Sequence, residues 1–227
     1  MVRRTKADAL ATRDKLLDAA ELLFAERGVS RTSLNDIAVA AGTTRGAIYW
    51  HFQDKAALFN AMMERVTLPL EDTLACAGQA SDDDTPTAPL ERMRSAFLNA
   101  LHKTVHDTPT RRVRDIATHK VEYVAEMLDV RDRHLKARDE CVAMTRAGLL
   151  QAARLGDVKL PMPAITAAHG LHALIDGLIQ NWLLAPEAFD LEAAGRQSFD
   201  AYIGGLGFTW ANARAPRRAA AAPVTAA

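Results

Sequence analysis

Apolar residues recur along most of the chain at steps of three and four, which is the spacing of one buried face of an α-helix. The first such helix is expected over residues 12–27, where Leu16, Ala20, Leu23 and Phe24 share a face. Alternation at every second residue, which would indicate strands, is almost absent, and no internal repeat is visible. The pattern therefore predicts an all-α protein.

Short helices are expected to follow the first one. Gly28 is placed to end it, and Ser33 is a good N-cap for a second helix, with Asp36 as the partner in a capping box. Gly42 ends that helix, and a third begins at once. Asp54 then begins a fourth, longer helix that runs past Leu70.

The third helix lies within "GTTRGAIYWHF", which concentrates aromatic and hydrogen-bonding side chains. Thr43 or Thr44 is expected to cap it. Helical spacing turns Ala47, Ile48 and Trp50 inward and leaves Arg45, Tyr49 and His51 available. A glycine turn between a capped helix and a short polar helix is typical of the helix-turn-helix, whose last helix enters the DNA major groove.

Beyond the fourth helix, "GQASDDDTPTAP" has the composition of a linker. Five further helices are expected over residues 90–106, 110–120, 121–155, 162–184 and 191–208. The tail from 212 to 227 is of low complexity and is expected to be disordered.

Charge and cysteine content add to this picture. The net charge of the 227 residues is zero, but residues 1–65 carry ten Lys and Arg against eight Asp and Glu. Arg3, Arg4 and Lys6 suggest a flexible basic arm. Cys76 and Cys141 form no CxxC motif, and no apolar run reaches the ~20 residues of a membrane span. A reducing cytoplasm, without membrane contact, is the expected location.

The stretch "TRDKLLDAAELLFAERGVSRTSLNDIAVAAGTTRGAIYWHFQDKAALF" resembles the N-terminal domain of the TetR family of transcriptional regulators. More narrowly, "MVRRTK", "TRGAIYWHF" and "IDGLIQNWLL" resemble the AcrR/TtgR type, which represses multidrug efflux pumps. The resemblance implies a helix-turn-helix DNA-binding domain (12–56) and a ligand-binding and dimerisation domain (57–211). Together with the flexible arm (1–11) and the disordered tail (212–227) expected from charge and composition, these divide the chain.

The resemblance places the DNA contacts on and around the third helix. Arg45, at its start, is the candidate for reading base edges, and Gly46 permits close approach. Tyr49 and His51 would position the helix by binding phosphates. A core position remains the favoured alternative for Trp50. The full set, including phosphate contacts at the second and fourth helices, is Thr32, Ser33, Thr43, Thr44, Arg45, Gly46, Tyr49, Trp50, His51 and Lys55.

The resemblance also implies an apolar ligand pocket in the second domain, in which Asp176 could attract a cationic drug. Arg138 would have to meet an acid such as Asp176 or point to water. The alternative is that most of these side chains fill a core. The set is Met93, Ala96, Phe97, Ala100, Thr118, His119, Arg138, Cys141, Thr145, His172, Ile175, Asp176 and Ile179.

A metal sensor is a lesser alternative. His169, His172 and Asp176 recur on one helical face, with Cys141 as a further soft ligand. The resemblance favours an organic ligand, so neither a metal nor a cofactor is expected. His102 and His106 look like part of a solvated face.

Two apolar stripes in the last two helices could form either intramolecular core or a homodimer interface. The resemblance favours the interface. The stripes are Leu171, Leu174, Leu178 and Trp182, and Phe199, Tyr202, Ile203 and Leu206.

The sequence thus favours a homodimeric repressor of an efflux operon. It would bind a near-palindromic double-stranded operator and leave it when a bulky hydrophobic or amphipathic molecule binds. Control by a protein partner or a metal is the alternative. An enzyme is not expected, because no nucleophile elbow, P-loop, HExxH or dinucleotide-binding turn is present.

Overall fold

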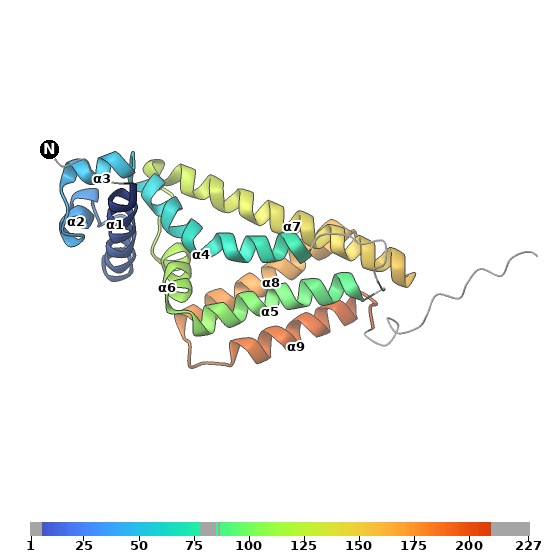
Figure 1. Ribbon diagram of the computed structural model, residues 1–227. Coiled ribbons are helices and arrows are strands. Elements are labelled where there is room, and N and C mark those ends of the chain that lie inside the picture. The colour runs from blue at the N-terminus through green and yellow to red at the C-terminus, as the bar shows by residue number, and fades with distance from the viewer. Residues whose placement is uncertain (1–5, 78–84, 86, 210–227) are drawn as a thin grey trace, which may run out of the picture.

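The computed structural model describes residues 6–77, 85 and 87–209, with side chains in the first range described up to Val66. In these ranges the chain forms helices and no strand (Figure 1), which confirms the all-α prediction. The tail and most of the expected linker lie outside the described residues. The elements are α1 Lys6–Arg27, α2 Leu34–Ala40, α3 Arg45–His51, α4 Lys55–Ala77, α5 Ala88–His106, α6 Thr108–His119, η1 Ala125–Met127, α7 Leu128–Gly156, α8 Ala164–Leu184 and α9 Leu191–Gly205.

The helix ends in the N-terminal unit, residues 6–54, follow the local signals in the sequence. Ser33 caps α2, and its backbone N–H donates to the Asp36 carboxylate, which completes the capping box. Thr44 caps α3 by accepting a hydrogen bond from the Ala47 amide. Gly28 and Gly42 have φ values of 81° and 63°, a conformation that favours glycine. Asp54 accepts a hydrogen bond from the Ala57 amide at the start of α4.

Two expected boundaries are wrong. Helix α1 begins at Lys6 rather than near residue 12, so residues 6–11 are helical and not part of a flexible arm; Ala7, Ala9 and Leu10 are strong helix formers. The helix expected from residue 121 begins at Leu128, after η1. The intervening residues belong to a connection that pairs with the N-terminal unit: the Lys120 carbonyl accepts a hydrogen bond from the Val29 amide.

A first apolar core joins the N-terminal unit to the rest of the molecule. Phe24 of α1 and Phe59 of α4 lie at its centre, with ring centroids 6.0 Å apart. The same core includes Ile116 of α6 and Met127 of η1. The N-terminal unit is therefore packed directly against α6 as well as α4, and η1 joins the same core through its contact with α4.

Polar contacts reinforce this junction. The buried Glu21 carboxylate of α1 accepts a hydrogen bond of 2.6 Å from Arg112 of α6. The Lys120 ammonium donates to the Ala25 carbonyl at 2.6 Å. These contacts connect α1 to α6 and to the chain that follows α6.

The second core lies among α5, α7, α8 and α9. Phe97 and Phe199 meet at its centre, with ring centroids 5.7 Å apart. At Gly195, an added methyl would clash with the buried Leu101 side chain, so α9 can approach α5 this closely only without a side chain there. Figure 1 shows the resulting elongated bundle extending away from α1–α3.

The two apolar stripes of the last helices lie mostly inside this core. The buried members are Leu171, Trp182, Phe199, Ile203 and Leu206. Leu174, Leu178 and Tyr202 are half-buried beside it. The alternative of intramolecular core therefore holds for the buried members, because the spacing of a stripe does not distinguish a core from an interface. None of the described helices is long and apolar enough to cross a bilayer.

One prediction concerns the start of α6, where the Asp107 carboxylate accepts a hydrogen bond of 2.8 Å from the Thr110 amide. Hydrogen bonds from Thr110 hold the pKa of Asp107 below its ordinary value. Asp107→Ala should therefore lower the free energy of unfolding by about 1 kcal/mol at pH 7, as measured by urea denaturation.

The lowered pKa sets the sign of the pH dependence. The contribution of the ionised cap is complete above the ordinary aspartate pKa and is lost as the pH falls through the folded-state value. Asp107→Asn is the matched control, because asparagine caps a helix about as well without titrating. Equal stability of the alanine variant and the wild type would contradict the assigned cap.

Candidate functional site

Helix α3 lies at one end of the molecule and is anchored by two apolar side chains (Figure 1). Ile48 is fully buried and Phe52, directly after the helix, is nearly so. The short turn between α2 and α3 fixes the angle at which α3 leaves the core. The rest of the α3 surface, including residues 44–46, 49 and 50, is thereby held toward solvent.

Three large side chains form that outer face. Arg45 is exposed, and its guanidinium carbon lies 5.7 Å from the centre of the Tyr49 ring. Trp50 is 73% exposed, and its ring meets the His51 ring edge-on at 4.5 Å. A cation, a phenol and an indole are side chains that hydrogen-bond base edges and phosphates or cover sugar surfaces.

Trp50 corrects an expectation. Both the inward orientation and the favoured core position are wrong, because Trp50 lies about 200° around the helix from the buried Ile48. An exposed tryptophan beside a basic side chain is available to a partner. The sequence pattern did not reveal this, since a short helix offers too few apolar positions to define its buried face.

Trp50→Ala is therefore expected to change the free energy of unfolding by no more than about 0.5 kcal/mol. The indole is largely in water in the folded chain, so its removal leaves no cavity. Urea denaturation of both proteins checks this. A loss comparable to that of a core substitution would show that Trp50 is packed against the protein.

Small and backbone groups complete the surface. Thr44 and Gly46 are exposed, and a methyl added at Gly46 would meet nothing closer than the Thr44 hydroxyl at 3.9 Å. Thr43 is half-buried. A surface pocket of about 450 Å³ lies between α3 and the start of α1. It is lined by Ala9, Thr44, Ala47, Trp50 and His51.

Two of the three expected phosphate contacts outside α3 are placed differently. Thr32 is buried and its hydroxyl donates to the Gly28 carbonyl, so its side chain cannot reach DNA. Of the two alternatives at α2, Ser33 is the exposed one, although its hydroxyl is engaged with Asp36. Lys55 also departs from expectation: its ammonium donates to the Val29 carbonyl at 3.1 Å and pairs with Glu126 at 3.0 Å.

Lys55 is thus a connecting residue within the protein. Its side chain is only 13% exposed, and both of its partners lie at the junction between the N-terminal unit and η1. The phosphate role expected from its place at the start of α4 is not supported by this orientation. Its partners are distant in sequence, so only the tertiary structure could reveal them.

The apolar members of the expected ligand pocket lie in the second core. Met93, Phe97, Ile175 and Ile179 are buried there, and Ala96 and Ala100 are buried on the same helix α5. A methyl added at Gly148 of α7 would come within 2.8 Å of the Met93 sulfur. Packing of this kind corresponds to the core alternative, and a ligand cavity among these residues remains a prediction.

Polar members of the set gather between α6, α7 and α8. Burial raises the pKa of the Cys141 thiol, and the hydrogen bond between Cys141 and Thr145 offsets part of this rise. Burial likewise lowers the pKa of His172, and the charge of the nearby Asp176 offsets part of this shift. Asp176 accepts a hydrogen bond of 2.6 Å from Gln180.

Arg114 of α6 belongs to this group and was missed from the sequence. Its Nε is buried and, within the described chain, has no hydrogen-bond partner, although the residue as a whole is half-buried. Burial lowers the pKa of Arg114, and the charge of Asp176 raises it in part. A cation on the apolar side of α6, between Val113 and Ile116, was the available signal, because a buried arginine needs a partner.

The remaining polar candidates are placed near water or in local pairs. Arg138 donates to the neighbouring Asp139 at 2.7 Å and is partly exposed, so it points to water rather than to Asp176. His119 is hydrogen-bonded to Asp115 in the preceding turn. Thr118 is half-buried on α6.

The α8 face weighed as an alternative metal site does not come together as a group of three donors within the described residues. Over the described ranges, one group of three potential donors comes together, and it consists of His102, His106 and Glu192 rather than His169, His172 and Asp176. Glu192 was missed, because it belongs to α9 and no spacing in the sequence connects it to α5.

Comparisons with known proteins agree with this architecture. Residues 16–62 match the model of the bacterial regulatory proteins of the tetR family, and residues 88–208 match that of the C-terminal region of MAATS-type transcriptional repressors. The HTH-type transcriptional regulator TtgR of Pseudomonas putida is 40% identical over 191 residues, covering 84% of this chain and 89% of TtgR.

Solved structures give the same result. NalD, the secondary repressor of the MexAB-OprM multidrug efflux pump in Pseudomonas aeruginosa, superposes with a TM-score of 0.76 at 34% identity, covering 88% of this chain and 98% of NalD. The SmeT–triclosan complex gives a TM-score of 0.75 at 29% identity over 86% of this chain and 90% of SmeT. SmeT is the repressor of the Stenotrophomonas maltophilia multidrug efflux pump SmeDEF.

The polar face of α3, the N-terminal unit that holds it and the helical bundle behind it are thus those of a DNA-binding regulator. The chain belongs to the TetR family of transcriptional regulators.

Proposed function

We propose that this protein represses a multidrug efflux operon and is released from its operator by a hydrophobic or amphipathic small molecule. The observation that carries the proposal is the outward face of α3, with Arg45, Tyr49 and Trp50 exposed at the free end of a TetR-type chain. The efflux assignment is supported by NalD and SmeT, both repressors of multidrug efflux pumps.

The regulator would act as a homodimer. TetR-family repressors bind operator DNA as dimers, and two recognition helices about 34 Å apart meet successive major grooves of a near-palindromic site. The remaining open side of α8 and α9 is consistent with a partner: methyl groups added at Gly177, Gly204 or Gly205 would meet no atom within 4 Å. Binding to an operator on the chromosome would place the protein in the cytoplasm.

The inducer would be held between α6, α7 and α8. Arg114 and Asp176 bring charges of both signs into an apolar surrounding, and the Arg114 Nε still offers a hydrogen bond. A neutral or weakly acidic molecule with a hydroxyl group suits this environment better than the cation suggested by Asp176 alone. Its binding would favour a conformation whose α3 helices no longer match the operator.

The experiment is a fluorescence-anisotropy titration of the purified protein with DNA adjoining its own gene, at low ionic strength because phosphate contacts weaken with salt. Triclosan is the first probe, because SmeT forms a complex with it. A coupling of about 1–3 kcal/mol, roughly 5 to 150-fold in operator affinity, is expected. No catalytic role is proposed.

Matched variants separate the two halves of the proposal. Arg114→Met should reduce release by triclosan without changing operator affinity, whereas Arg111→Met on the same helix should leave both unchanged. No binding to the adjoining DNA by the folded protein would refute repression of that operon. Operator binding that persists with triclosan and a wider set of phenols and biocides would favour control by a protein partner.

A further inference from the structure

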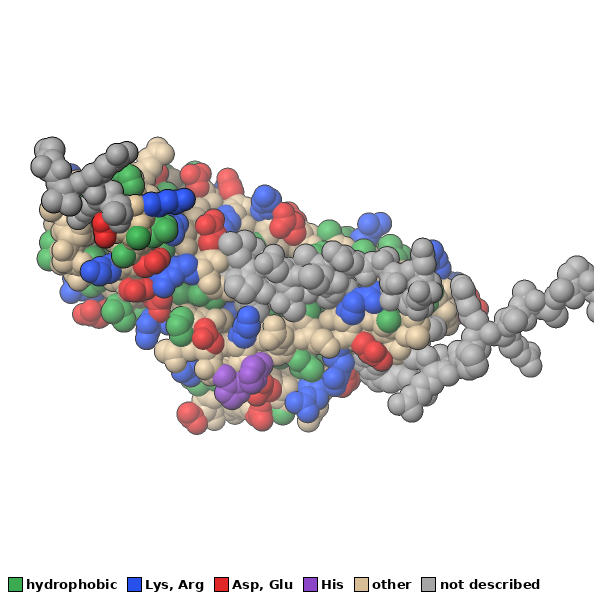
Figure 2. Space-filling view, viewed as in Figure 1, with side chains coloured by type: hydrophobic (Ala, Val, Ile, Leu, Met, Phe, Trp, Pro, Cys, Tyr) green, Lys and Arg blue, Asp and Glu red, His purple; other side chains and the backbone are tan. Residues whose placement is uncertain are grey.

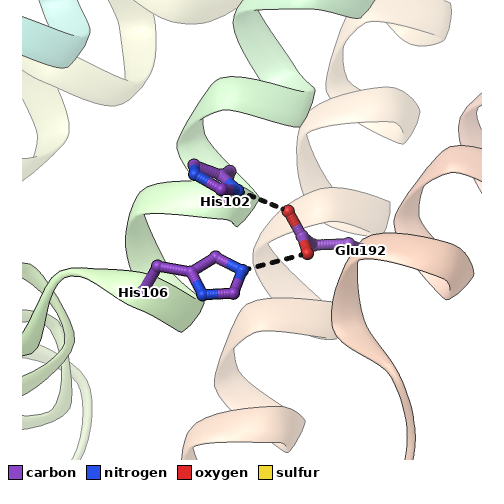
Figure 3. Close-up of side chains that lie close together, drawn as sticks. All are labelled: His102, His106 and Glu192. Carbon is purple, nitrogen blue, oxygen red and sulfur yellow. Dashed lines mark hydrogen bonds and ion pairs between the residues drawn. The ribbon is translucent and has the colours of Figure 1, made fainter.

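Two histidines of α5 and one glutamate of α9 converge on the surface of the bundle. His102 Nδ1 lies 2.8 Å from Glu192 Oε1, and His106 Nε2 lies 3.2 Å from Glu192 Oε2 (Figure 3). The two imidazoles are one helical turn apart, with ring centroids separated by 4.4 Å. Glu192 lies in the first turn of α9, so the group joins two helices that are 90 residues apart in sequence.

The spacing of these atoms matches a metal site. One nitrogen of each imidazole and one carboxylate oxygen all lie within 4.8 Å of one another. Around Zn²⁺, ligand atoms at about 2.0–2.1 Å in tetrahedral geometry are about 3.3 Å apart. If the Glu192 side chain moved slightly away from the two imidazoles, an ion could lie between the three groups without any movement of the helices.

Access and rigidity also suit an ion. The side chains of His102 and His106 are 59% and 54% exposed, and that of Glu192 is about a third exposed, so an ion could enter and water could complete its shell. Figure 2 shows histidine side chains gathered on this face of the molecule. The backbone beneath is held by the packing of Leu101 against Gly195 and by the Arg94–Asp200 ion pair.

We propose that His102, His106 and Glu192 form a binding site for a divalent transition metal of the Zn²⁺ class. Two imidazoles and one carboxylate favour Zn²⁺, Ni²⁺, Co²⁺ or Cu²⁺ over Mg²⁺ and Ca²⁺, which prefer oxygen ligands alone. This site goes beyond the proposed response to organic molecules and lies on α5 and α9, away from Arg114 and Asp176.

The bound ion would fix the end of α5 to the start of α9. His102 and His106 also line a hollow of about 480 Å³, whose other walls are Glu21 and Arg65 of the N-terminal unit and α4 together with the α5–α6 turn. The site therefore borders the junction through which the bundle meets the DNA-binding end. Metal binding would stabilise the folded chain by mass action.

The ordinary alternative is a surface hydrogen-bond group that pairs histidine with glutamate and binds no ion. The two differ in stoichiometry and in the need for all three residues. A hydrogen-bond group loses little when one histidine is replaced, whereas a three-ligand site loses most of its affinity.

The test uses full-length protein without a histidine tag, stripped of metal and titrated with Zn²⁺ against a fluorescent zinc indicator at pH 7.5. One equivalent per chain should bind, and the melting temperature should rise with Zn²⁺ but not with Mg²⁺. His106→Ala and Glu192→Gln should each weaken binding at least about tenfold and remove the thermal shift.

His169→Ala is the matched control, because it removes an exposed histidine of α8 and leaves the site intact. Circular dichroism of each variant verifies folding. Absence of Zn²⁺ binding by the wild type, or binding unchanged in both His106→Ala and Glu192→Gln, would overturn the proposal. Loss of binding in His169→Ala alone would assign the ion to α8 instead.

Discussion

Arg45→Ala is expected to weaken binding to the operator by about 1–3 kcal/mol and to relax the preference for one base pair in each half-site. Arg45 is the first residue of α3 and is exposed, with its guanidinium beside the Tyr49 ring. An arginine in this place can donate two hydrogen bonds to O6 and N7 of guanine. Fluorescence anisotropy with operator and scrambled duplexes measures both effects.

Arg31→Ala is the matched control. Arg31 is also an exposed arginine of the N-terminal unit, and its Nε donates to the Arg27 carbonyl. Its removal takes away the same charge, so any loss should be similar on operator and scrambled DNA and should shrink at high salt. If Arg45→Ala behaved in the same way, Arg45 would be a phosphate contact rather than a reader of bases.

Arg112→Ala is expected to lower the free energy of unfolding by about 1–3 kcal/mol. Arg112 donates to the carboxylate of Glu21, which is buried between α1 and α6, and without this partner a charge would remain buried. The Arg112 side chain is about a third exposed, so water offsets part of the loss. Urea denaturation followed by circular dichroism measures the change.

Two controls identify the cause. Arg112→Met combined with Glu21→Leu should recover much of the stability, because it removes both charges and keeps apolar volume at the junction. Arg65→Ala also removes an ion pair between α1 and α4, but this pair with Asp18 is exposed and should contribute less than about 1 kcal/mol. Equal effects of Arg112→Ala and Arg65→Ala would contradict the importance of burial.

Local signals were sufficient for much of the fold. The capping box of Ser33 and Asp36 and the Thr44 cap depend on atoms only three residues apart, so the sequence contains the whole interaction. The late start of α7 had no such signal. The Lys120 carbonyl pairs with the Val29 amide, and a bond across 91 positions cannot be recognised from helical periodicity.

The candidate site was predictable to a similar depth. Arg45 and Tyr49 have the expected exposed positions: Arg45 is the first residue of α3, and Tyr49 lies about 100° around the helix from the buried Ile48. Lys55 was misplaced because its partners, Val29 and Glu126, are distant in sequence. Trp50 was misplaced because a short helix does not define its buried face, and Thr32 because its hydroxyl bonds the Gly28 carbonyl one turn away. The chemistry of a side chain indicates which partners it can bind. It does not indicate whether that side chain is already paired with another group of the same protein.

The ligand region shows the same limit. Met93 and Phe97 satisfy a pattern that a pocket and a core share, and both lie in the core. Arg114 differs, because a buried cation with a hydrogen-bonding atom to spare is not explained by packing. A search for charges on the apolar side of predicted helices would have found it.

Val29 has a consequence for observing the protein at work. Its amide donates to the Lys120 carbonyl and its own carbonyl accepts from Lys55, so both polar atoms of one buried residue are satisfied across the junction. That amide hydrogen exchanges with deuterated solvent when its bond to the Lys120 carbonyl opens, that is, when the N-terminal unit separates from the chain after α6. Deuterium uptake at this single peptide group therefore reports, in solution, how firmly the two halves of the regulator are coupled.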